Sequence, residues 1–130
     1  MTKTATAHVK KLQFYHDVFV TAMEDPHHVL EVLKYKHYSE GLEWVPKMAD
    51  AFAVVKDVEQ DGKEYHVTLK TIAAAFDKLR AAKPDDKIGL HASYRSRFIA
   101  AENALDAGEI DAYDAMLILQ LGIFGECIYG

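Results

Sequence analysis

The chain of 130 residues is poor in cysteine and proline, with one cysteine, Cys127, and three prolines. A single cysteine excludes an internal disulfide and favours a reducing compartment. The longest apolar run, residues 115–124, contains Gln120 and Gly122 and is too short to span a bilayer. Residues 1–9 lack the apolar stretch of a secretory signal. We therefore expect a cytoplasmic protein without membrane contact.

Positive charge is also scarce. The chain holds 15 Lys and Arg against 20 Asp and Glu, which gives a net charge of −5. Residues 84–130 are the most acidic part, with three bases and eight acids. Proteins bind nucleic acids through basic footprints that neutralise phosphates. The charge distribution therefore predicts no general nucleic-acid binding.

The usual motifs of catalysis are missing from the sequence. The chain has no phosphate-binding glycine loop, nucleophile elbow or zinc-ligand pattern, and it contains only three serines. His27 and His28 follow Glu24 closely, but Pro26 interrupts the helix between Glu24 and His27, so these two cannot act as metal ligands on one face. Cys127 follows an acidic residue, which does not favour a thiolate. We expect no metal, no cofactor and no catalytic residue set.

Most apolar residues recur at helical spacing. Helices are predicted over residues 4–23, 26–38, 46–52, 68–83, 91–107 and 112–121. The expected N-terminal caps are Asp25, Thr68 or Thr71, and Asp111 with Asp114, and the expected C-terminal stops are Gly41, Gly108 and Gly122. The last helix is apolar on nearly all sides, which is typical of a central helix.

Residues 53–70 break the helical pattern. Asp61-Gly62 lies between two valine-rich runs, and such a pair flanked by alternating apolar residues is a strong hairpin signal. A two-residue loop pairs Val58 with Tyr65 and Val54 with Leu69, which gathers their apolar side chains on one face. The alternative is that the preceding helix continues to about residue 58 and that Asp61-Gly62 turns between two helices.

These elements predict a mainly α protein. We expect a single domain over residues 1–130, built as a compact bundle of about five to six helices with a small β-hairpin at residues 53–69. Because an isolated hairpin is marginally stable, its apolar face must lie on the helices.

Ser93, Arg95, Ser96 and Arg97 form the densest polar cluster, at the start of a predicted helix. Helix N-termini attract anions through free N–H groups and the helix dipole, so these four are the candidate binding residues for an anion or nucleotide. Arg95 and Arg97 point about 200° apart on a helix, which makes a shared clamp on one phosphate difficult. The alternative is that both arginines pair with acidic residues at the surface.

The chain ends in an apolar segment, residues 123–129, although chain ends are usually polar and frayed. Phe124, Ile128 and Tyr129 either pack into the core, for example as an extra strand beside the hairpin, or are covered by a partner. Trp44, the only tryptophan, lies in a connector before a proline, and we expect it to be partly exposed. These four residues are the candidate protein interface.

The segment Val67-Thr68-Leu69-Lys70-Thr71-Ile72-Ala73 and the ending from Asp106-Ala107-Gly108-Glu109-Ile110-Asp111 through residues 122–130 resemble small bacteriophage-encoded proteins with no assigned activity. The resemblance covers about half of the chain and carries no catalytic motif. It implies an accessory phage protein that acts on a host component.

Three functions remain to be compared. The first is a non-enzymatic protein that binds another protein or a second copy of itself, including as a homodimer. The second is an anion-binding or nucleotide-binding module at residues 91–97. The third is a histidine-dependent enzyme that uses His27, His28 or His66. The lack of a convergent catalytic set favours the first.

Overall fold

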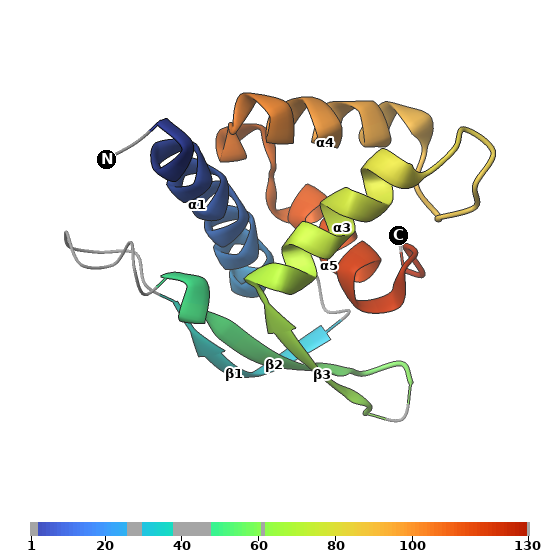
Figure 1. Cartoon of the computed structure of the whole chain (residues 1–130). Helices are drawn as coiled ribbons and strands as arrows, with labels where there is room; N and C mark the ends of the chain where they lie inside the picture. Colours follow the sequence, from blue (N-terminus) through green and yellow to red (C-terminus); the bar gives the residue numbers. More distant parts are fainter. Residues whose placement is uncertain (1–2, 26–29, 38–47, 61, 130) are drawn as a thin grey trace.

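The computed structural model in Figure 1 describes residues 3–25, 30–37, 48–60 and 62–129. Its elements are, in chain order, α1 (Lys3–Glu24), β1 (Leu30–Lys36), the 3-10 turn η1 (Met48–Asp50), β2 (Phe52–Asp57), β3 (Glu64–Thr68), α3 (Leu69–Ala81), α4 (Ala92–Ala104), the 3-10 turn η2 (Ala107–Glu109) and α5 (Ala112–Phe124).

The helices and the sheet form two layers. The three strands are antiparallel in the order β1-β2-β3, and the four described helices lie on one side of this sheet (Figure 1). Helix α5 packs against both α1 and α3, and its residues from Asp114 to Leu121 are all buried. This burial confirms the central position that an all-round apolar helix predicts.

Aromatic side chains join the helices in the core. Phe14 of α1 meets Phe76 of α3 edge to face, with 5.4 Å between the ring centroids. Tyr15 lies against the same ring at 5.8 Å. Such pairs add a specific geometry to the hydrophobic burial of three large rings, so they fix α1 on α3.

The prediction of a helix over residues 26–38 is wrong for the residues that the structure describes. Residues 30–36 form the edge strand β1, which pairs with β2 from Leu30 opposite Asp57 to Lys36 opposite Phe52. Leu30 and Leu33 have helical spacing, but pairing with β2 offers a ladder of backbone hydrogen bonds that local propensity does not outweigh. Within the described residues there are therefore fewer helices than expected and one strand more.

The predicted hairpin is confirmed, with a different register. Val55 lies opposite Tyr65, and Lys56 lies opposite Glu64. The amide of Asp57 donates to the carbonyl of Lys63 at 2.9 Å, so the loop is longer than Asp61-Gly62 alone. Because the shift is an odd number of residues, it exchanges the two faces of β2.

The exchange of faces decides which side chains of β2 are buried. Ala53, Val55 and Asp57 are fully buried against the helices, while Val54 lies on the outer side. The pairing expected from the sequence puts Val54 on the buried face, and Asp57, an odd number of residues along the strand, on the opposite face. The structure corrects both assignments.

The predicted helix starts agree with the structure better than the predicted ends. The Thr68 amide donates to the Thr71 hydroxyl at 3.1 Å, and Asp111 and Asp114 form a reciprocal capping box. Helix α4, however, ends before Leu105, whose left-handed φ of 53° allows its N–H to reach the last carbonyls. Helix α5 continues through Gly122 and stops at residue 125.

Gly122 is needed inside α5 because α3 passes very close to it. A Cβ at this position would overlap the carbonyl oxygen of Thr71, which belongs to the first turn of α3. A glycine inside a helix costs about 1 kcal/mol relative to alanine. The close approach of the two backbones explains why glycine is present here despite that cost.

Replacing this glycine tests the close packing of α3 on α5. We expect Gly122→Ala to lower the free energy of unfolding by about 1–3 kcal/mol, because steric overlap outweighs the better helix propensity of alanine. Urea denaturation measures the difference. The control is Gly108→Ala in η2, where the added methyl group meets only the Asp106 side chain, at 3.1 Å. An increase in stability for Gly122→Ala would contradict the packing.

Candidate functional site

The outer face of the sheet is the side that points away from the helices. Because directly opposed residues in an antiparallel sheet share a face, the pairing assigns its members. We call outer face the side chains that this pairing assigns, together with Leu33, which lines the same hollow as Lys56 and Glu64: Glu31, Leu33, Lys34, Lys36, Phe52, Val54, Lys56, Glu64, His66 and Thr68. Within the described ranges, Figure 1 shows no helix or strand over this side.

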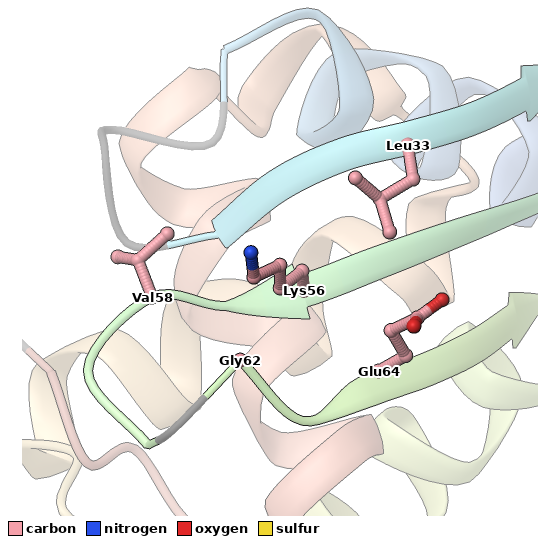
Figure 2. Close-up of a pocket in the computed structure, with 5 residues that line it drawn as sticks. All are labelled: Leu33, Lys56, Val58, Gly62 and Glu64. Carbon is pink, nitrogen blue, oxygen red and sulfur yellow. The ribbon is translucent and has the colours of Figure 1, made fainter.

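A hollow of about 520 Å³ lies on the outer face. Figure 2 shows Leu33 of β1 and Glu64 of β3 on either side of Lys56 of β2, with Val58 and Gly62 at the hairpin end. Leu33 on β1 and Val58 in the hairpin turn are 42% and 48% exposed. The hollow thus combines exposed apolar surface with a central cation.

Charges on the outer face are arranged at two ends. At one end Lys56 lies directly opposite Glu31 on β1 and Glu64 on β3, so opposite charges flank it on both sides. At the other end the charged residues are Lys34 and Lys36 of β1. Counting three lysines and two glutamates, the face carries +1 in a chain of net charge −5.

The free edge of β1 is unsuited to pairing with a further strand, although its outer face is exposed. The pairing shifts between Val32 and Lys34, which leaves Leu33 as an extra residue in a bulge. Bulges and lysines on edge strands are two devices that discourage the addition of another strand. Leu33 therefore offers its side chain to the face, while the edge itself is a poor template for pairing.

The polar cluster at residues 91–97 is built into the loop and helix around it. The Arg95 guanidinium donates to three backbone carbonyls, those of Leu90 at 3.1 Å, Lys83 at 2.9 Å and Asp86 at 2.5 Å. His91 is the N-cap of α4, where its Nδ1 accepts from the Ser93 amide at 3.1 Å. An anion at this helix start would have to compete with these contacts, and the anion site stays a prediction.

Arg97 has a different partner from Arg95. Its two terminal nitrogens donate to both carboxylate oxygens of Asp114, at 2.6 and 2.7 Å, and its guanidinium lies 5.3 Å from the centre of the Tyr94 ring. Burial raises the pKa of Asp114, but hydrogen bonds from Arg97 and Asp111 and the charge of Arg97 outweigh it and hold the pKa below its ordinary value. The two arginines therefore have separate structural roles.

The chain end is held by one amide side chain inside the protein. Gln120 of α5 is fully buried, and its Oε1 accepts from the amides of Ile128 and Tyr129 at 2.9 and 2.7 Å. Its Nε2 donates to the carbonyl of Tyr129 at 2.7 Å. The Cys127 amide also donates to the Ile88 carbonyl at 2.7 Å. The tail thus packs on α5 and the loop before α4, and it does not extend the sheet.

The tail also reaches the hairpin. The Tyr129 hydroxyl donates to the fully buried Asp57 carboxylate, 3.1 Å from each oxygen, and the Glu59 amide donates to the same group at 2.9 Å. Phe124 meets the Tyr65 ring edge to face at 5.3 Å. Of the predicted interface residues, Phe124 and Tyr129 therefore have internal contacts, and Ile128 is 44% exposed.

Cys127 has no features of a reactive thiol. Burial and the nearby Glu126 carboxylate raise the pKa of the thiol to about 11, so it is protonated at neutral pH. Its sulfur lies 3.4 Å from the carbonyl oxygen of Leu117. This agrees with the default for a free cysteine in an apolar segment, which is a small packing residue.

The other predicted residues are spread widely. His66 lies on the outer face, with its ring 5.6 Å from that of Phe52. Trp44, His27 and His28 lie outside the described residues. In the part of the chain that the structure describes, no three His, Cys, Asp or Glu side chains gather so that they could hold a metal ion. None of the described helices has the length and apolar character needed to cross a bilayer.

Comparisons with protein-family models, curated proteins and solved structures found no match to this chain.

Sequence reasoning missed the outer face because it depends on the strand register. The sequence does contain some indication of a strand here, since Glu31, Lys34 and Lys36 are polar positions in a run that also contains valine and tyrosine. Reading that run as a strand would have placed alternate residues on a solvent side.

The Arg97–Asp114 pair yields a prediction with a pH dependence. Because the folded-state pKa of Asp114 is lowered, the pair contributes stability above the ordinary carboxyl pKa and loses it as the pH falls through the folded-state value. We expect Arg97→Gln to reduce the free energy of unfolding at pH 7 by about 1–2 kcal/mol, because it leaves a buried carboxylate short of donors.

Urea denaturation at pH 7 and at about pH 3 measures this effect, and the difference between the variant and the wild type should shrink at the lower pH. Lys87→Gln, which removes an exposed loop cation, is the matched control. A deficit that is equally large at both pH values would show that the loss is one of packing.

Proposed function

We propose that the protein is a non-enzymatic binding module that presents the outer face of its sheet to another protein. The observation that supports this best is the exposure of Leu33 and Val58 around a hollow on a sheet face that no described element covers. Exposed apolar side chains among polar residues are a feature of interaction sites. The resemblance of the C-terminal half to phage-encoded proteins supports a role as an accessory protein that binds a host component.

Charge indicates what kind of partner fits. The outer face has a central apolar column, Phe52 and Val54 on β2 with Leu33 beside it, and lysines along β1. A partner with acidic side chains around an apolar centre complements this pattern. A dimer through the same face would bring together two faces that each carry a net charge of +1, whereas an acidic partner neutralises that charge. We therefore propose a different protein as the partner.

The chain end supports this choice of surface. An apolar tail is a candidate interface when it lacks internal partners, but Gln120 and Asp57 hold the last residues through both backbone and side chain. Recruiting the tail for binding would break those contacts. The outer face needs no such rearrangement.

Site-specific photo-crosslinking tests the proposal. A photoreactive phenylalanine analogue replaces Leu33 on the outer face, and a matched protein carries it at Ala100, an exposed position on α4. We expect an acidic host protein to be crosslinked from position 33 and not from position 100. That protein is then purified, and its affinity is measured by calorimetry.

Calorimetry on this protein and its purified crosslinked partner tests which residues form the contact surface. We expect Leu33→Glu and Lys34→Glu to weaken binding at least about tenfold, a loss of 1.4 kcal/mol, and Ala100→Glu to have no effect. Equal affinity for Leu33→Glu and the wild type would reject the outer face as the contact surface. Crosslinking of position 33 only to a second copy of the chain would favour a homodimer and contradict the proposed partner.

A further inference from the structure

A second hollow lies between α1, η1 and α3 and shares no lining residue with the hollow on the outer face. This groove has a volume of about 470 Å³. Its apolar lining comes from Leu12 and Tyr15 of α1, Ala49 of η1, and Leu69 and Ala73 of α3. Three elements that are distant in sequence therefore form one apolar recess.

The floor of the groove is rigid. Leu69 and Tyr15 are 4% and 8% exposed, and the Tyr15 hydroxyl donates to the buried Glu102 carboxylate of α4 at 2.7 Å. Arg80 of α3 contacts the same carboxylate and balances its charge. Burial and this carboxylate raise the pKa of Tyr15 well above its ordinary value, so the hydroxyl stays protonated and can donate to Glu102 at physiological pH. The recess is thus formed before any ligand arrives.

Two lysines lie at the groove or beside it. His8 of α1 and Lys70 of α3 line it, and the Lys11 ammonium lies 6.0 Å from the centre of the Tyr15 ring. Asp50 follows Ala49 and is the acid that adjoins the groove in sequence. In a chain of net charge −5, this local excess of cations favours an anionic group at the mouth of an apolar recess.

The size of the groove indicates a small molecule. Small-molecule sites have volumes of about 300–1,000 Å³ and are mostly apolar, with a few polar groups that orient the ligand. Protein interfaces use about 20–30 residues on each side, far more than this groove offers. The size and charge of the groove are independent of the function proposed for the sheet.

We propose that the groove binds a free fatty acid, with the aliphatic chain on Leu12, Leu69 and Ala73 and the carboxylate at Lys70. Burial of methylene groups supplies most of the affinity, at about 0.8 kcal/mol for each group. The lysine contact is exposed, so it contributes orientation and a smaller share of the affinity.

Calorimetry with dodecanoate, below its micelle concentration, tests this on the full chain. We expect saturable binding of one dodecanoate, and weaker binding of dodecanol. Ala73→Leu fills the groove and should weaken binding at least about tenfold. Lys70→Gln should weaken it about two- to fivefold, the range of an exposed charge pair.

Matched controls lie on the same helix. Ala74→Leu adds the same side chain at the next, exposed position of α3, and Lys78→Gln removes a lysine two turns further along. Both should bind dodecanoate as the wild type does. Leu33→Glu on the outer face should also bind normally, which separates this proposal from the proposed protein contact.

A spin-labelled fatty acid provides a readout on the unmodified protein. It should broaden the NMR signals of the Ala49 and Ala73 methyl groups and leave Ala100 unchanged. Absence of saturable binding would reject the proposal, as would equal binding by the Ala73→Leu and Ala74→Leu variants. Equal affinity for dodecanol and dodecanoate would contradict the proposed contact between Lys70 and the carboxylate. Binding to phospholipid vesicles, but not to free dodecanoate, would contradict the proposed ligand.

Discussion

The arrangement of this protein depends on one buried amide, the side chain of Gln120. It lies near the end of α5, in a stretch whose neighbours are aliphatic, and a polar group in such a place is costly unless it is paired. Besides the Met116 sulfur one turn earlier, its partners are the backbone groups of Ile128 and Tyr129, so the chain must fold back at residue 125 to reach it. The tail backbone supplies hydrogen-bond partners to the buried Gln120 side chain, and that side chain supplies partners to the tail backbone.

The folded-back tail connects the two layers of the molecule. Tyr129 brings a hydroxyl to Asp57, a carboxylate at the end of β2 that is fully buried and needs donors. Phe124 adds a ring contact to Tyr65 of β3. Through these contacts the central helix holds the hairpin, and the hairpin holds the edge strand β1. The sheet can then present its opposite face to solvent without the support of a second layer.

The same arrangement explains why two different surfaces remain for binding. The outer face of the sheet is broad, mixed in charge and marked by exposed Leu33 and Val58, which suits a protein partner. The groove beside Tyr15 has an apolar lining with Lys70 in it and Lys11 near the Tyr15 ring, which suits a small amphipathic anion. Both lie on rigid elements, and neither needs the groups that hold the tail.

Local interactions were predictable from the sequence, and distant ones were not. The capping box of Asp111 and Asp114 spans three residues, so its pattern is visible in the chain. The strand β1 and the register of β2 depend on pairing across the sheet and on Tyr129, which is 72 residues from Asp57. The outer face follows from that register, and so the sequence pattern placed Val54 on the wrong side.

Hydrogen exchange of the native protein tests the central claim, that the chain end is part of the folded structure. The amides of Ile128 and Tyr129 should exchange with the same free energy of opening as the amides of α5, because their acceptor is buried in that helix. Exchange of these two amides at the rate of an unstructured peptide, while α5 stays protected, would contradict it.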